Sequence, residues 1–226
     1  PSGTVTVKSG STLQDEYELT LGMSFEQGYI SPGFVTDPKT KKVVFEDPLI
    51  LLSEKKISSV HSILPLLEKA AQSRRPLLII AENVEGDVLS TLILNKLRGG
   101  LKVAAVKAPM FGRQRKEVLQ DLAALLGTRV FSEDLGDKLE DITLDQLGSS
   151  KSVLIDSDTT TIVEGAGSKE GAVKARVDDI NEELTKATSE YDREKLSERL
   201  AKLVGGVAVI KVGGASEVEV SERKDL

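Results

Sequence analysis

The sequence contains no cysteine and only one histidine, His61, among its 226 residues. Without cysteine the chain can form no disulfide, no thiolate metal site and no thiol nucleophile. A single histidine leaves little scope for histidine-based metal or triad chemistry. Any catalysis would therefore have to use carboxylates or lysines.

An excess of positive charge and long apolar runs are also missing. The chain carries 30 basic and 36 acidic residues, a net charge of −6, which argues against a nucleic-acid surface because phosphate contacts require a basic excess or a basic face. The longest apolar run, residues 76–81, has the length of a strand, far below the roughly 20 residues that span a bilayer. We expect neither nucleic acid nor a membrane as a partner. The 39% hydrophobic and 29% charged residues that are present are typical of a soluble globular protein.

Both ends of the chain have the alternating pattern of short strands, at residues 4–8 and 16–21 and again at 207–212 and 217–220. Glycines stand where these ends meet the long middle, at Gly22 and at Gly205-Gly206. The arrangement predicts a domain inserted into another whose halves are the two ends, with these glycines as hinges. Ordinary helix stops and turns are the alternative that the pattern leaves open.

The middle of the chain alternates between strand and helix periodicity. Strands are predicted at 49–52, 77–81, 101–107, 130–131 and 153–155, and helices at 58–72, 85–98 and 113–126. Residues 168–203 predict one long charged helix, or an antiparallel pair broken near Thr188-Ser189. Strands that alternate with helices predict an α/β fold with an at least partly parallel sheet.

Three short segments could suggest a nucleotide or metal site: Asp158-Thr159-Thr160-Thr161, Gly165-Ala166-Gly167 and Gly213-Gly214. The sequence has neither the phosphate-binding pattern G-x-x-x-x-G-K-[S/T] nor G-x-G-x-x-G between a strand and a helix. An enzyme that uses Asp156, Asp158 and Thr159 on a nucleotide or a metal is therefore the second hypothesis.

The more informative feature is an excess of apolar residues on two predicted helices. On the helix at 85–98 they cover about 240° of the circumference, more than the roughly 100° that a core-facing helix needs; they are Val88, Leu89, Leu92, Ile93, Leu94 and Leu97. The helix at 58–72 has one stripe at Ile63, Leu66 and Ala70 and a second, about 100° around, at Leu64, Leu67 and Ala71. If the first stripes face the core, the second can line a shared groove for other polypeptides. Complete burial of both helices is the alternative.

Several motifs, in order along nearly the entire chain, resemble those of the group I chaperonins, the GroEL type of bacteria and organelles. They are Gly22-Met23-Ser24-Phe25, Gly28-Tyr29-Ile30-Ser31-Pro32, Pro76-Leu77-Leu78-Ile79-Ile80-Ala81-Glu82, Leu94-Asn95-Lys96-Leu97-Arg98-Gly99, Val106-Lys107-Ala108-Pro109, Phe111-Gly112, Asp192-Arg193-Glu194-Lys195-Leu196 with Glu198-Arg199, and Gly205-Gly206-Val207-Ala208-Val209-Ile210-Lys211-Val212-Gly213. The resemblance implies that residues 22–206 form the apical, polypeptide-binding domain, a layer of mixed sheet flanked by helices. It implies that residues 1–21 and 207–226 form small strand-rich parts of the intermediate domain.

The same resemblance implies a chaperone function. The apical domain captures non-native polypeptide on an apolar groove and releases it when the mobile loop of a co-chaperonin takes the same groove. Carried over residue by residue, the binding residues are Tyr29, Phe34, Leu64, Leu67, Leu89, Ile93 and Leu94, and the hinges are Gly22 and Gly206. The parent protein would be an ATP-hydrolysing, seven-membered ring of one or several subunit types, whereas we expect this chain alone to be monomeric.

By the same resemblance the ATP site lies outside this sequence. We therefore expect this chain to have no catalytic residue and to hold no cofactor or metal, while the parent binds ATP and Mg²⁺. Residues 48–51 and 54–59 are closer to mitochondrial members, which implies the mitochondrial matrix, with the chloroplast stroma or bacterial cytoplasm as alternatives.

The chain departs from the family pattern at four places. Gly33 replaces an aromatic residue, Gln27 an arginine, Met110 a glycine, and Arg113-Gln114 an acidic helix start. Loss of the aromatic side chain at position 33 removes a large apolar contact and is expected to weaken capture.

Overall fold

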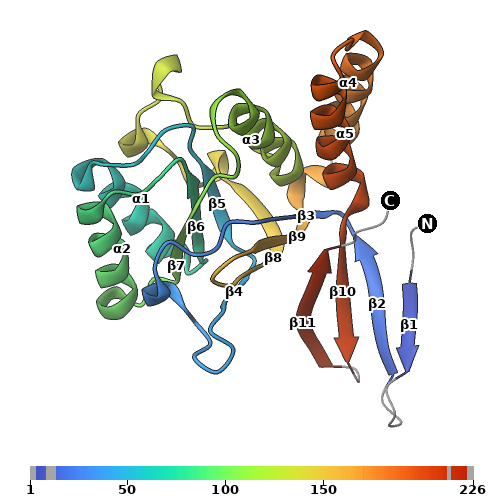
Figure 1. Ribbon diagram of the computed structural model, residues 1–226. Helices are drawn as coiled ribbons and strands as arrows, with labels where there is room; N and C mark the ends of the chain where they lie inside the picture. The colour runs from blue at the N-terminus through green and yellow to red at the C-terminus, as the bar shows by residue number, and fades with distance from the viewer. Residues whose placement is uncertain (1–3, 9–13, 170, 213–214, 223–226) are drawn as a thin grey trace.

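The computed structural model describes residues 4–8, 14–169, 171–212 and 215–222 (Figure 1). In that part the α-helices are α1 (Val60–Ser73), α2 (Gly86–Gly99), α3 (Gly112–Leu126), α4 (Ala172–Lys186) and α5 (Glu190–Gly205). The strands are β1 (Thr4–Lys8), β2 (Gln14–Thr20), β3 (Gly22–Phe25), β4 (Val43–Glu46), β5 (Leu49–Leu52), β6 (Leu77–Ala81), β7 (Val103–Lys107), β8 (Gly148–Ile155), β9 (Thr160–Gly165), β10 (Val207–Val212) and β11 (Ala215–Glu222). Short 3₁₀ helices include η1 (Pro32–Phe34), η3 (Leu139–Asp141) and η4 (Leu144–Gln146).

The large sheet has the strand order β3-β9-β8-β5-β6-β7, and β4 also pairs with β8. The β5–β6 and β6–β7 pairs are parallel, whereas the β3–β9, β8–β9, β4–β8 and β5–β8 pairs are antiparallel. All residues of β5 and β6 are buried, as expected for strands covered on both faces. Figure 1 shows α1 and α2 along one side of this sheet and α3 along the other. The predicted α/β fold with a partly parallel sheet is confirmed.

The two ends of the chain form a separate antiparallel sheet in the order β1-β2-β10-β11 (Figure 1). Its central pair joins the two ends, since Thr20 of β2 lies opposite Val207 of β10. The expected domain limits, 22–206 against 1–21 and 207–226, therefore fall where the chain passes from one sheet to the other. Gly213-Gly214, one of the three short segments considered above for a nucleotide or metal site, lies outside the described residues.

The charged segment 168–203 was expected as one long helix or as an antiparallel pair, and the pair is what forms, as α4 and α5. The break falls at residues 187–189, where the Ser189 side chain accepts a hydrogen bond from the Asp192 backbone N–H and so caps α5. Figure 1 shows this hairpin projecting from the molecule beside α3.

A cluster of buried charges attaches the α4–α5 hairpin to α3. Arg199 donates two hydrogen bonds to the Asp121 carboxylate, at 2.8 and 2.9 Å, and Arg176 donates a third at 2.7 Å. Arg176 also contacts Glu117 at 3.0 Å. The Asp121 side chain is 1% exposed and that of Arg199 8%. Burial lowers the pKa of Arg199, but the hydrogen bond and charge of Asp121 outweigh burial and raise that pKa above its ordinary value.

Three strands were not predicted, β3, β4 and β9, and β8 begins at Gly148 and not at residue 153. Buried hydroxyl groups explain much of the difference, because they interrupt the apolar pattern while finding partners inside the sheet. The Ser24 and Thr161 hydroxyls lie 3.2 Å apart, and Ser150 donates to the Ser152 carbonyl. The strand predicted at 130–131 is reduced to a single bridge between Phe131 and Ser53.

Candidate functional site: the outer face of two adjacent helices

Helix α1 has one side in the core and a large apolar residue, Leu64, in solvent. The Ser59 side chain caps the helix by accepting the Ser62 backbone N–H at 3.2 Å. The predicted core stripe of Ile63, Leu66 and Ala70 is fully buried. Leu64, about 100° around the helix axis from Ile63, is 38% exposed. Of the predicted second stripe, Leu64 and Ala71 are exposed, whereas Leu67 is buried.

Helix α2 has apolar side chains on more of its circumference. Val88 and Leu92 are fully buried and form the core side. Leu89 and Ile93 are partly buried and pack against the core. Leu94 and Leu97 are 47% and 70% exposed. Leu97 is the more exposed of the two, yet it was not among the predicted site residues, although it belongs to the same wide apolar arc.

The segment before α1 covers one flank of α2. A Cβ placed on Gly33 would lie 3.2 Å from Cδ1 and 3.4 Å from Cγ1 of Ile93, so η1 packs on the Ile93 side of the helix. Leu94 lies about 100° further around the axis and therefore points away from η1. Apolar side chains therefore lie on both sides of the line along α2 that faces away from the core. We call Leu64, Leu89, Ile93, Leu94 and Leu97 the two-helix face.

Two predicted binding residues are not on this face. Phe34 is 0% exposed and Leu67 1% exposed, and both belong to the core. Leu67 lies only about 40° around the α1 axis from the buried Ile63, and therefore on the side of the helix that faces the core. The expectation that these two side chains line an open groove was wrong; they lie beneath the surface that they were expected to form.

Tyr29 has an intermediate position. Its side chain is partly buried and packs against the core. Its hydroxyl donates to the Lys41 carbonyl at 3.1 Å, and its backbone forms a bridge with Val106 at the edge of β7. Tyr29 therefore supports the η1 segment next to α2.

The predicted hinge glycines lie at neighbouring points between the two sheets. A Cβ on Gly22 would meet the Ile162 carbonyl oxygen at 2.3 Å and Val207 Cγ2 at 2.8 Å. A Cβ on Gly206 would lie 2.4 Å from the Thr20 carbonyl oxygen. Gly206 also has φ 67° and ψ −165°, a combination that is essentially restricted to glycine. Both positions require glycine in this conformation.

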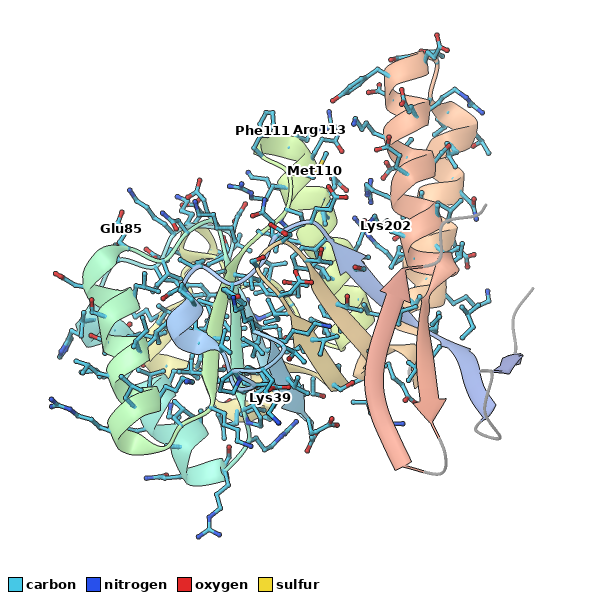
Figure 2. The ribbon with its side chains drawn as sticks, turned by 60° about the horizontal axis from the view of Figure 1, so that its bottom comes forward. Lys39, Glu85, Met110, Phe111, Arg113 and Lys202 are labelled. Atoms are coloured by element: carbon cyan, nitrogen blue, oxygen red, sulfur yellow. The ribbon has the colours of Figure 1, made fainter. Side chains whose placement is uncertain are left out.

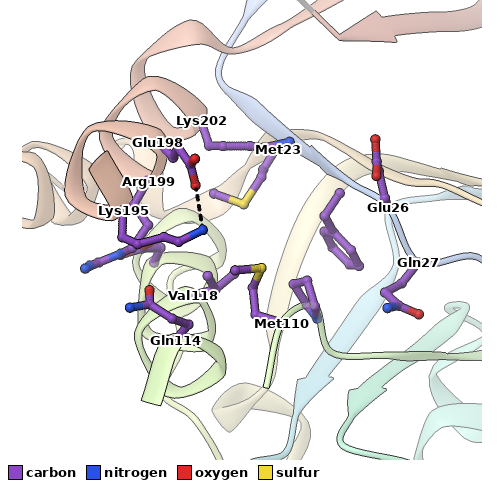
Figure 3. Close-up of a pocket in the computed structure, with 13 residues that line it drawn as sticks. Met23, Glu26, Gln27, Met110, Gln114, Val118, Lys195, Glu198, Arg199 and Lys202 are labelled. Carbon is purple, nitrogen blue, oxygen red and sulfur yellow. Dashed lines mark hydrogen bonds and ion pairs between the residues drawn. The ribbon is translucent and has the colours of Figure 1, made fainter. Parts of the chain in front are cut away.

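A concavity of 340 Å³ lies between β3, α3 and α5. Its lining includes Met23, Val118 and Met110 (Figure 3).

Met110 has φ 65°, a left-handed conformation that costs an L-residue about 1–2 kcal/mol, and the Arg115 guanidinium donates to its carbonyl. The backbone conformation at position 110 therefore favours glycine, which is the residue that the resemblance leads us to expect there. Figure 2 shows Met110, Phe111 and Arg113 together at the start of α3, where Phe111 is 81% exposed.

The residues of the alternative enzyme hypothesis form the turn between β8 and β9. Asp156 Oδ1 accepts the backbone N–H groups of Asp158 at 2.8 Å and Thr159 at 2.7 Å. This oxygen therefore closes the turn, as Asp side chains commonly do. Within the described ranges no three His, Asp or Glu side chains are grouped so as to hold a metal ion. The arrangement offers no support for a nucleotide or metal site here.

No protein-family model matches this chain. The motif resemblance and the geometry of the two-helix face are therefore the basis for any functional proposal. Among the helices of the described segments, none combines the length and the apolar character that crossing a bilayer requires.

Proposed function

We propose that the two-helix face binds exposed apolar segments of non-native polypeptides. The observation that carries this proposal is the exposure of Leu64, Leu94 and Leu97 on two helices whose other sides are already in the core. Exposed apolar patches on a folded protein mark surfaces for other polypeptides. An amphipathic helix or an extended segment can pack on such a face through side-chain contact alone.

The energetics favour weak binding with little sequence preference. Full burial of a leucine contributes about 1.5–3 kcal/mol. With Leu64, Leu94 and Leu97 exposed by 38%, 47% and 70%, covering them would contribute about 3 kcal/mol. One face would therefore bind in the millimolar range or more weakly. Several linked copies raise the apparent affinity by about 10²–10⁴ without any new contact.

This need for several copies agrees with the oligomer that the resemblance implies. We propose that the chain is the apical domain of a group I chaperonin, carried by an ATP-driven, seven-membered ring. In the parent, the two-helix face would hold unfolded clients and then the co-chaperonin mobile loop, and ATP and Mg²⁺ would act in another part of the subunit. The mitochondrial matrix is the proposed compartment.

The test is capture of a chemically denatured, reduced model protein by the chain immobilised at high density. Leu64→Ser and Leu94→Ser are each expected to reduce capture at least twofold, and the double variant to abolish it. Leu135→Ser is the matched control, because Leu135 is 80% exposed but lies outside the two-helix face. Capture that persists in the folded double variant, or that falls equally in the control, would show that binding takes place elsewhere.

A further inference from the structure

A concavity of 280 Å³ lies where the carboxyl ends of α1 and α2 meet. Its lining is Ala71, Arg74, Arg75, Pro76, Gly99, Gly100, Leu101 and Lys102. Three of these eight residues are cationic and none is acidic, although the chain as a whole carries a net charge of −6. The site is therefore positively charged on a protein that is otherwise negative.

Two of the three cations are available to a ligand. Arg75 is already engaged, since it donates to the Asp47 carbonyl at 3.0 Å and contacts the Asp47 carboxylate at 3.1 Å. Arg74 and Lys102 are both exposed, and neither forms an ion pair with a carboxylate in the part of the chain that the structure describes. Asp47 offsets Arg75, and the carbonyl ends of α1 and α2 each carry a partial negative charge, so the concavity retains a net positive charge smaller than that of its two unpaired cations.

Left-handed residues end both helices at this concavity. Arg74 has φ 61° and caps α1 by donating its backbone N–H to the Ala71 carbonyl. Gly100 has φ 70° and caps α2 in the same way on the other side of the concavity. Glycine is the favoured residue at such a position. The strain of an L-residue there, about 1–2 kcal/mol, is comparable with the upper range of what a cation gains at the carbonyl end of a helix.

We propose that this concavity binds a small phosphoryl anion of about the size of a diphosphate. Arg74 would provide a planar fork that donates two hydrogen bonds to phosphate oxygens, and Lys102, which also lines the concavity, would provide a point charge. Arg75, held in place by Asp47, would add the third positive charge. The concavity lies at the amino-terminal edge of β6 and β7, where Pro76 and Lys102 precede these strands, and it shares no residue with the two-helix face.

The experiment is calorimetric titration of the whole chain with inorganic pyrophosphate at low ionic strength and without divalent cations. Arg74→Gly and Lys102→Gln are expected to weaken binding by at least about tenfold each, the loss expected for a hydrogen bond to a charged group. Arg74→Gly relieves the left-handed backbone, so this variant is expected to fold at least as well as the parent. Arg113→Gln is the charge-matched control, because Arg113 is exposed on α3 and does not line the concavity.

A parallel titration with ADP distinguishes the two sources of a diphosphate. Equal affinities for ADP and pyrophosphate would identify the free anion as sufficient, and a tighter ADP complex would identify a nucleotide; both support a phosphoryl site. The proposal is overturned if neither compound binds, if the Arg74 and Lys102 variants bind as the parent does, or if Arg113→Gln loses as much affinity as they do.

Discussion

Removing the carboxylate of Asp121 is the sharpest test of how the α4–α5 hairpin is attached. Asp121 accepts three hydrogen bonds from Arg199 and Arg176 at 2.7–2.9 Å, and its side chain is 1% exposed. Asp121→Ala leaves the Arg199 guanidinium, 8% exposed, without its main counter-charge. Breaking one side of such a buried pair costs about 3–5 kcal/mol.

The assay is urea unfolding followed by circular dichroism, combined with native-state hydrogen exchange. We expect the midpoint to fall by the equivalent of about 3–5 kcal/mol. We also expect amide protection to fall first in α4 and α5, because the buried charge cluster joins them to α3.

Asp178→Ala on α4 is the matched control, since its carboxylate contacts Lys174 at 3.3 Å but is 63% exposed. Such exposed pairs on a helix contribute only about 0.3–0.5 kcal/mol. A loss below about 1 kcal/mol in Asp121→Ala, or a loss no larger than in the control, would refute the view that this cluster holds the hairpin to α3.

Three further predictions concern other parts of the fold. Arg129 and the Ser132 N–H lower the pKa of Asp137 to about 2. This carboxylate therefore stabilises the fold above about pH 4 and loses that effect as the pH falls toward 2. The difference in melting temperature between the wild type and Asp137→Asn should shrink over that pH range. Gly206→Ala should cost about 2 kcal/mol or more, whereas Gly205→Ala, with nothing within 4 Å of the added Cβ, should be neutral or stabilising in the same urea titration. Gly33→Phe should tighten capture of denatured protein, and unchanged capture would show that position 33 lies outside the contact.

The sequence predicted the helices and parallel strands because their apolar residues repeat regularly. Ile63, Leu66 and Ala70 on α1 are buried as their spacing requires. Strand β9 was not predicted and β8 was predicted only at residues 153–155, because Ser150 and Thr160 interrupt the apolar pattern. Both are buried, and their hydroxyls donate to the Ser152 and Gln27 carbonyls.

The site was predicted only in part for a different reason. Helical spacing places Leu64 and Leu67 on one stripe, yet Leu64 is 38% exposed and Leu67 1%. Around the axis of α1, Leu67 lies about 40° and Leu64 about 100° from the buried Ile63, so the edge of the core falls between them. Phe34 is buried because η1 returns to the edge of β7. Spacing within one helix identifies apolar residues, but only the tertiary structure decides which of them remain uncovered.

The close approach of the two connections between the sheets has a practical consequence. Gly206 lies against Thr20, and Gly22 lies against Val207, so the segment from 22 to 206 leaves and re-enters the small sheet at nearly the same point. A segment with adjacent ends tolerates transplantation into a surface loop of an unrelated host protein. Short spacers would suffice, and several copies of the two-helix face could then be arrayed on a scaffold of chosen symmetry.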